Sequence, residues 1–168
     1  MEPLKDRQTV HRDGTEVRTL IEGVRVLPLI THVDARGSLT QLPRELFSEP
    51  VVDAHQVSIR PGRVKGWIVH KLQTDRLFFW QGDLRVVLYD AREDSATYRR
   101  IDDLCFGALK PAYCVIPPGV FHAVQNLGRE TASHMSFPTR AYEHADPDKY
   151  RLPLDTQEIP FDFNKAGW

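Results

Sequence analysis

The residues Pro117-Pro118-Gly119-Val120-Phe121-His122-Ala123-Val124-Gln125-Asn126 carry the strongest fold signal in the chain. Two prolines and a glycine favour a tight turn, because proline presets one backbone angle and glycine tolerates angles that other residues avoid. The residues that follow suit a pleated strand. Such a strand, leaving a turn at the mouth of a barrel, would direct His122 into the interior. A turn followed by a half-buried histidine of no functional role fits the same residues.

Short apolar runs continue on both sides of this stretch and are interrupted by twelve prolines and ten glycines. Runs spaced by roughly ten to twenty residues favour a sandwich or a barrel. The clearest hairpin joins Leu77–Trp80 to Leu84–Tyr89 through Gln81-Gly82-Asp83, whose glycine can take a positive φ. The other predicted elements are strands at 24–30, 38–42, 55–60, 64–70, 98–101, 112–116, 122–126 and 132–137, a short helix at 43–47, and an irregular or helical segment at 142–149.

Length and composition predict one folded domain. The chain has 168 residues, of which 41% are hydrophobic and 27% charged, and its formal net charge is −1. A chain of this size builds one core, and a balanced charge provides no general attraction for nucleic acid or an anionic membrane. We expect a single domain over residues 1–168, with an N-terminal extension at 1–23 and a C-terminal closing segment at 142–168.

The first residues are polar, and no stretch approaches the roughly 18 consecutive apolar residues of a membrane-spanning helix. The sequence therefore predicts a cytoplasmic protein. Two cysteines, Cys105 and Cys114, are present. They could pair if they lay on adjacent strands, but in the cytoplasm we expect both to be reduced.

Two segments resemble the motifs of the cupin superfamily. The opening stretch fits the second cupin motif, PxGxxHxxxN, and the first motif maps onto Ile68-Val69-His70, Asp75 and Gly82 with isoleucine at its first histidine position. The resemblance implies an all-β, double-stranded β-helix, a jelly-roll barrel in a single domain. His70, Asp75 and His122 remain at ligand positions and could hold iron(II), zinc or manganese.

The order of several motifs resembles that of the dTDP-4-dehydrorhamnose 3,5-epimerases, sugar-nucleotide enzymes with this barrel. The resemblance spans roughly residues 24–163. The matching segments are Asp34-Ala35-Arg36-Gly37, Gln56-Val57-Ser58, Val64-Lys65-Gly66-Trp67, Asp90 to Tyr98, Ile116 to His122, and Asp155 to Phe163. The resemblance implies proton abstraction next to a keto group, which requires a base on one face and stabilisation of the enolate oxygen.

Three functional positions of that family are altered in this chain. Its members use a histidine base backed by an aspartate, a tyrosine acid on the opposite face, and a lysine near the keto oxygen. The base position falls on Ile68, the lysine position at or near Asp75-Arg76, and the tyrosine position around Ser136-Phe137. Because isoleucine cannot accept a proton, one altered epimerisation is expected rather than the standard two.

His70 is the first candidate for a replacement base, since residues two apart on a strand face the same side. Asp155 could orient it, or it could face His122. Tyr142 and His134 are candidates for a replacement acid. A histidine at a strand end facing water and a surface tyrosine are the simpler interpretations of His70 and Tyr142. The predicted catalytic residues are therefore His70, His122, Asp155 and Tyr142.

The predicted function is an isomerase or epimerase that acts on a nucleotide-linked 4-keto-6-deoxy sugar, with dTDP as the expected carrier, and needs no cofactor. Two alternatives stay open: a metal-dependent enzyme and a non-catalytic sugar-nucleotide binder. Edge-strand exchange, common in the family, implies a homodimer. The predicted substrate-binding residues are Arg36, Gln56, Arg60, Lys65 and Arg76. The basic strand residues Arg60, Lys65 and Arg76 would contact the diphosphate unless they simply form a solvated strand face.

Overall fold

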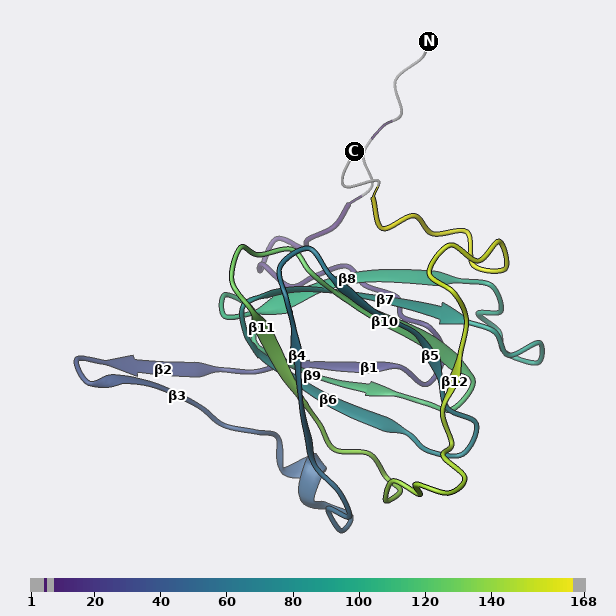
Figure 1. Cartoon of the computed structure of the whole chain (residues 1–168). Helices are drawn as coiled ribbons and strands as arrows, with labels where there is room; N and C mark the ends of the chain where they lie inside the picture. The colour runs from purple at the N-terminus through teal and green to yellow at the C-terminus, as the bar shows by residue number, and fades with distance from the viewer. Residues whose placement is uncertain (1–4, 6–7, 165–168) are drawn as a thin grey trace.

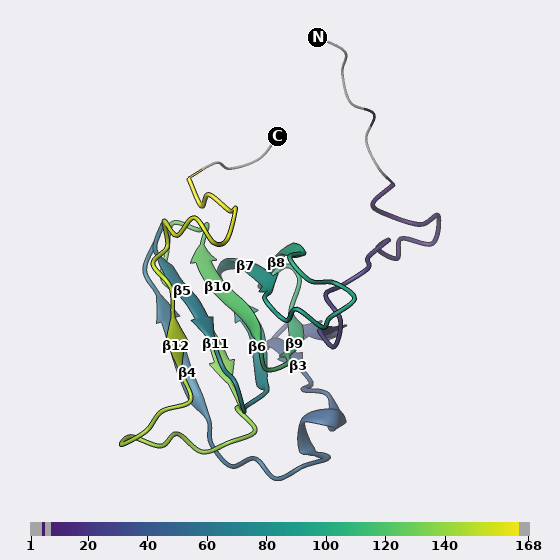
Figure 2. The same ribbon diagram turned by 90° about the vertical axis from the view of Figure 1, so that its right-hand side faces the viewer.

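Two antiparallel five-stranded sheets pack against each other in the computed structural model, which describes residue 5 and residues 8–164 (Figures 1 and 2). The strand orders are β1-β9-β6-β11-β4 and β12-β5-β10-β7-β8. The predicted all-β jelly roll is confirmed. The elements are β1 (Arg25–Pro28), β2 (Thr31–Asp34), β3 (Gly37–Thr40), the 3-10 helix η1 (Arg44–Phe47), β4 (His55–Ile59), β5 (Val64–Val69), β6 (Asp75–Gln81), β7 (Asp83–Asp90), β8 (Ile101–Gly107), β9 (Ala112–Ile116), β10 (Val120–Asn126), β11 (Ala132–Ser136) and β12 (Tyr150–Arg151).

The predicted hairpin of β6 and β7 is wrong, because β6 pairs with β9 and β11 in one sheet while β7 pairs with β8 and β10 in the other. The chain crosses from one sheet to the other at the connection between β6 and β7. Strand β6 shows how the sequence alternates across a sheet. Leu77 and Phe79 lie in the main core between the sheets. Phe78 and Trp80 point to the other side, where their rings stack with centroids 4.9 Å apart. The connecting Gly82 has φ +79°, and a Cβ there would lie 2.3 Å from Cβ of Ala132, so only glycine fits.

The turn before β10 joins this strand to the end of β5. The N–H of Gly119 donates to the carbonyl of His70 at 2.8 Å, and Gly119 has φ +80°. At the other end of β10, the side chain of Asn126 donates to the carbonyls of Ile59 and Glu130 at 2.8 and 2.7 Å. The glycine and asparagine of the motif therefore hold β10 in register at both ends, and His122 comes to lie opposite Ile68.

The segment after β7 is held by a buried carboxylate. Asp90 is fully buried and accepts hydrogen bonds from Arg92 and from the hydroxyls of Ser95 and Thr97. The polar residues of this network, between Asp90 and Tyr98, therefore have a structural role. The strand predicted at 98–101 is wrong in extent, since residues 97–100 form a turn in which Arg99 has φ +65° and β8 begins at Ile101.

The main core fills one half of the space between the sheets. It is formed mainly by side chains of β6, β7, β8, β9 and β10. Ile21, Val24, Ile59 of β4 and Ala132 of β11 complete it, and Val26 of β1 packs against it. The half bounded by β4, β6 and β11 on one side and β5, β10 and β12 on the other is open. Segment 142–149, for which the sequence leaves an irregular path and a helix both open, is irregular and contains no helix or strand.

A two-stranded hairpin of β2 and β3 extends away from the two sheets (Figure 1). Both cysteines are free: Cys105 lies on β8 and is exposed, and Cys114 is buried on β9. Among the described residues, no helix is long and apolar enough to cross a membrane.

Candidate active site

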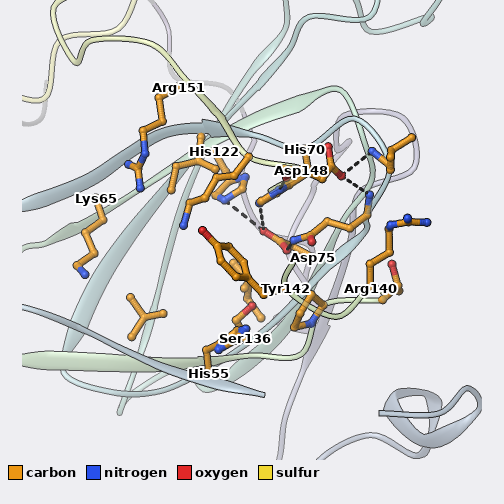
Figure 3. A pocket seen from close by; sticks show the side chains of 18 of the residues that line it. His55, Lys65, His70, Asp75, His122, Ser136, Arg140, Tyr142, Asp148 and Arg151 are labelled. Carbon is orange, nitrogen blue, oxygen red and sulfur yellow. Dashed lines mark hydrogen bonds and ion pairs between the residues drawn. The ribbon is translucent and has the colours of Figure 1, made fainter. Parts of the chain in front are cut away.

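The open half of the barrel contains a cavity of about 1190 Å³. Its walls come from β4, β5, β6, β10, β11 and the segment that leads from β11 to β12 (Figure 3). Ionisable side chains from both sheets point into it. Those used below are Lys65, His70, Asp75, His122, His134, Tyr142, Lys149 and Arg151.

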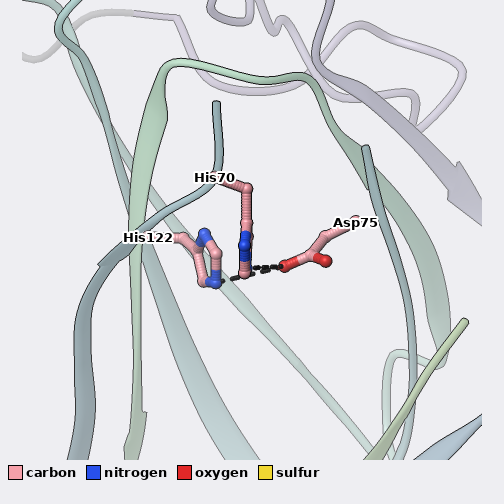
Figure 4. Close-up of side chains that lie close together, drawn as sticks. All are labelled: His70, Asp75 and His122. Atoms are coloured by element: carbon pink, nitrogen blue, oxygen red, sulfur yellow. Dashed lines mark ion pairs between the residues drawn. The ribbon is translucent and has the colours of Figure 1, made fainter. Parts of the chain in front are cut away.

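Two histidines and one aspartate meet at one wall of the cavity (Figure 4). Nε2 of His70 and Nε2 of His122 each lie 3.3 Å from Oδ2 of Asp75. The two imidazole rings are nearly parallel, with centroids 5.7 Å apart. We call His70, Asp75 and His122 the triad. Its three side chains are almost completely shielded from solvent, at 11%, 7% and 8% exposure.

Strand geometry explains why these three residues meet. His70 directly follows β5, Asp75 opens β6, and His122 lies in β10, which pairs with β5. Adjacent residues of a strand face opposite sides, so Asp75 points into the cavity and Arg76 points out of it. The predicted proximity of His70 and His122 is found, and Asp75 lies between them.

Asp148 fixes the turn that carries His70. Its carboxylate accepts hydrogen bonds from the backbone N–H groups of Lys71, Leu72 and Gln73 at 2.9, 2.8 and 2.9 Å. Its main-chain oxygen contacts Nδ1 of His70. The side-chain amide of Gln73 donates to Oδ1 of Asp75 at 2.7 Å. Contacts with Asp148 and Gln73 therefore fix the positions of His70 and Asp75.

The triad residues have different proton affinities. Burial opposes ionisation of Asp75, but the hydrogen bond from His70 and the charges of both histidines lower its pKa to about 2. Burial also disfavours the charged form of His70, yet the hydrogen bond and charge of Asp75 and the carbonyl of Asp148 raise its pKa. Burial lowers the pKa of His122 and outweighs the attraction of Asp75. At neutral pH His70 therefore holds its proton more strongly than His122 does.

The triad also offers a ligand set for a metal ion. One ligand atom from each residue lies within 4.8 Å of the others. Two imidazoles and a carboxylate suit iron(II), zinc or manganese. The contact of His70 Nδ1 with a carbonyl is a common arrangement for a ligating histidine. The residues present therefore fit a divalent metal as well as proton transfer.

Tyr142 lies on the segment between β11 and β12, which also carries Asp148. Its ring packs edge-on against His144, with centroids 4.9 Å apart, and its backbone N–H donates to Asp53 at 3.2 Å. Figure 3 shows its hydroxyl end inside the cavity, directed toward the wall that carries His122. His134 and Ser136, which alternate on β11, also line the cavity. Burial lowers the pKa of His134 to about 4, so His134 is neutral.

Lys65 is the one predicted substrate-binding residue that lines the cavity. Simple alternation from Ile68 would turn it outward. However, Ile68 lies opposite His122 and Lys65 opposite Val124, so β5 accommodates one extra residue at this point. Such a β-bulge reverses the direction of the side chains beyond it. The bulge therefore brings Lys65 into the cavity.

The other four predicted substrate-binding residues lie outside the cavity of this chain. Gln56 alternates with the cavity-lining His55 and Val57 and faces away. Arg60 lies beyond β4 and is exposed. Arg36 is at the tip of the β2–β3 hairpin and pairs with Asp34 at 2.5 Å.

Arg76 is buried on the outer face of β6. Its guanidinium donates to the carbonyls of Phe137, Leu46 and Pro138 at 2.7, 3.3 and 3.3 Å. Asp155, predicted to orient His70, does not line the cavity and is exposed in the closing segment. Asp75 and the carbonyl of Asp148 are the groups that contact His70.

Several cavity residues were missed because they lie on the segment between β11 and β12, whose path has no periodic pattern in the sequence. Asp148, Lys149 and Arg151 are the most important of these. Arg151 lies opposite Ile68 in the pairing of β12 with β5. Its strand has only two residues, too few for any recognisable alternation.

Two curated proteins are similar to this chain along most of their length. The Spore coat polysaccharide biosynthesis protein SpsL of Bacillus subtilis is 37% identical over 147 residues, which cover 86% of this chain and 97% of that protein. The Probable low-salt glycan biosynthesis epimerase Agl13 of Haloferax volcanii is 32% identical over 148 residues, covering 86% of this chain and 95% of the relative. No protein-family model matches the chain.

Solved structures agree with these relatives. A dTDP sugar isomerase from Desulfovibrio desulfuricans superimposes with a TM-score of 0.80 at 26% identity, covering 88% of this chain and 94% of its own. Solved dTDP-4-dehydrorhamnose 3,5-epimerases share the fold at lower identity.

Proposed function

Since this chain belongs to the sugar-nucleotide epimerase family that includes dTDP-4-dehydrorhamnose 3,5-epimerase, we propose that its cavity epimerises a nucleotide-linked 4-keto-6-deoxy sugar through an enolate. The observation that carries the proposal is the triad at one wall of a large cavity, with the hydroxyl of Tyr142 in the same cavity and directed toward the wall of His122. Epimerisation needs a proton acceptor on one face of the sugar ring and a proton donor on the other, because a proton leaves one face and returns to the opposite one.

His122 is the proposed proton acceptor. Both ring nitrogens of His70 face acceptors, namely Asp75 and the carbonyl of Asp148, so His70 retains two protons. Burial keeps His122 neutral and therefore able to accept a proton at Nε2. Asp75, 3.3 Å away, then stabilises the imidazolium that His122 becomes. In this assignment the base has moved from β5, where the family has it, to β10.

Tyr142 is the proposed proton donor. Its hydroxyl lies in the cavity, and its segment is fastened to Asp53 through a backbone hydrogen bond. The carbon loses its proton to His122, the electron pair moves toward the keto oxygen, and the proton from Tyr142 reforms the C–H bond on the opposite face. Tyr142 then regains a proton from solvent, and His122 releases to solvent the proton that it took from carbon.

Basic residues at one end of the cavity support a phosphorylated substrate. Lys65 and Arg151 both point into it from the β5–β12 side (Figure 3). Charge-assisted hydrogen bonds make such side chains suited to a diphosphate. A dTDP-linked sugar is the proposed substrate, and a cytoplasmic setting belongs to the same proposal.

The test is incubation of the protein with dTDP-4-keto-6-deoxyglucose in heavy water, with NMR at C3 and C5 of the sugar. Deuterium should enter at one of these carbons, and the variants His122→Asn and Asp75→Asn should both slow its entry, His122→Asn the more strongly. Binding of the nucleotide sugar with no deuterium entry would instead show a non-catalytic binder.

The metal-dependent alternative uses the same three residues and is tested in the same samples. A bound metal would act there by polarising the keto oxygen. Metal analysis should be combined with exchange measurements before and after chelation. Exchange that is unchanged in chelated, metal-free protein supports the proton-transfer proposal, and loss of exchange restored by one divalent metal supports the alternative.

A homodimer is also proposed. The β2–β3 hairpin extends from the body of the chain and exposes Val33 and Leu39 at 78% and 62%, and Ile30, directly before β2, is exposed at 73%. Apolar residues on a two-stranded arm are poorly stabilised alone, because such a hairpin needs a surface to pack against. A second copy of the chain would supply this surface, as exchange of edge strands does in the family.

A further inference from the structure

We propose that Lys149 is a catalytic residue whose ammonium group stabilises the negative charge on the keto oxygen of the enolate. The inference rests on the proposed epimerase function and adds the group that completes it. An enolate forms readily only when a cation or hydrogen-bond donor faces the oxygen on which charge develops. The triad and Tyr142 handle protons at carbon, so a separate group is needed for this oxygen.

The strand position that provides a lysine in related epimerases cannot do so here. Asp75 faces the cavity at this position and is an anion that would oppose enolate formation. Arg76 is turned to the outer face and uses its guanidinium on three backbone carbonyls. No cation of β6 therefore reaches the reacting carbon atoms. The cation that stabilises the enolate oxygen therefore has to come from another strand or segment.

The segment before β12 places Lys149 beside the triad. Tyr150 pairs with Val69 and Arg151 with Ile68, so continuation of this register puts Lys149 next to His70. Lys149 and Arg151 both line the cavity, while Tyr150 between them faces out and holds the ammonium of Lys71 over its ring at 4.3 Å. This alternation is that of a strand with one face toward the site.

Neighbouring hydrogen bonds fix the backbone of Lys149. The preceding residue, Asp148, is bound to the 71–73 turn by three hydrogen bonds and contacts His70 through its carbonyl. The base of the lysine side chain is thus tied to the same turn as the triad. A catalytic group held in this way loses little freedom when substrate binds.

The charges around Lys149 match the proposed role. Burial lowers its pKa, with further lowering by Arg151 and Lys65 and an opposing effect of Asp75. Its charge in turn acts on His122. Among the salt bridges of the described residues, none involves Lys149. The ammonium therefore shares the cavity with His122 and Asp75, the proposed base and the carboxylate that supports it, and is available to a developing anion.

The deciding experiment compares Lys149→Met with Lys65→Met and Arg151→Met. Deuterium entry into dTDP-4-keto-6-deoxyglucose is measured at saturating sugar nucleotide, and the Kd is measured separately by calorimetry. Lys149→Met should lower the saturated exchange rate about 100-fold or more while changing the Kd little, as expected for a donor that acts on the developing charge. Lys65→Met and Arg151→Met should mainly weaken binding. Lys71→Met, whose side chain lies outside the cavity, is the matched control and should retain the wild-type rate.

Chemical rescue separates charge from structure. Lys149→Cys in a Cys105→Ser background can be alkylated with 2-bromoethylamine, which rebuilds an ammonium of nearly the same length, and exchange should return. Cys105→Ser treated alone controls for other modification.

Two outcomes would overturn the assignment of Lys149 alone: wild-type exchange that persists at full saturated rate in Lys149→Met, or a loss confined to the Kd. Absence of exchange in the wild-type protein would overturn the epimerase function itself.

Discussion

The division of labour between the two histidines follows from what each ring nitrogen faces. His70 lies between a carboxylate and a carbonyl, while His122 shares the carboxylate and is otherwise buried. A histidine with two acceptors is stabilised as the cation, and a histidine deprived of water is stabilised as the neutral ring. The isoleucine at position 68 therefore does not remove the capacity for proton transfer from this cavity.

Substitution of the two histidines should have unequal effects. His122→Asn removes the proposed base and should lower deuterium exchange by about 1000-fold, in the range of general-base catalysis. His70→Asn retains the base and should cost about 10-fold, through poorer orientation of Asp75. Exchange rates at saturating substrate provide the measurement, and His11→Asn on the exposed N-terminal segment is the control. Equal losses for both variants would contradict the assignment of His122 as the base.

The pH dependence of exchange should reflect the environment of His122. Burial lowers its pKa from the usual 6.5, so the neutral, proton-accepting form persists at more acidic pH than in an ordinary histidine. The acid limb of the rate profile should thus lie below pH 6.5. Asp75 raises the pKa of His122, so Asp75→Asn should move this limb to still lower pH and reduce the plateau rate. An acid limb above pH 6.5 would show that another group is the base.

Alternation along single strands made part of the site predictable. His70, Asp75 and His122 could be selected from their spacing, because each lies at a defined position of a strand or turn motif. Which face Lys65 occupies depends on a bulge between β5 and β10, which arises from pairing with a distant strand. Lys149 and Arg151 depend on a segment without regular structure, so tertiary contacts, above all those of Asp148, decide their position.

Arg76 provides a test at the level of β6. Its guanidinium satisfies three carbonyls of two neighbouring segments, and its removal would leave buried acceptors without donors. Arg76→Met should therefore lower the free energy of unfolding by about 2 to 4 kcal/mol, measured by urea denaturation. Arg85→Met, which breaks a partly exposed pair with Asp103, should cost less than about 1 kcal/mol.

Folded Arg76→Met should still bind the nucleotide sugar with wild-type affinity. A stable variant with weakened binding would show that Arg76 contacts substrate after all.

The whole molecule has a closed half, which is filled by the main core, and an open half, which contains the cavity. The main core is formed mainly by β6, β7, β8, β9 and β10, and it borders the cavity at Leu77 and Val124, which belong to both. The β2–β3 hairpin belongs to neither half. The proposed homodimer would cover its exposed apolar side chains.

The arm should therefore control the oligomeric state. The double variant Val33→Lys, Leu39→Lys places a charge on each face of the hairpin, as Val33 lies opposite Ser38 and Leu39 opposite His32. It should convert a dimer to a monomer in light scattering coupled to size-exclusion chromatography. Leu109→Lys, at a fully exposed turn, is the control and should leave the dimer intact. A wild-type monomer, or a double variant that still dimerises, would rule out this role of the arm.

The central claim is that this cavity enolises a nucleotide-linked keto sugar without the usual histidine at position 68. The most direct measurement is NMR of dTDP-4-keto-6-deoxyglucose incubated with metal-free wild-type protein in heavy water. The account predicts deuterium at one carbon next to the keto group, with inversion at that carbon. A sugar nucleotide that binds and returns with every C–H bond intact would contradict it.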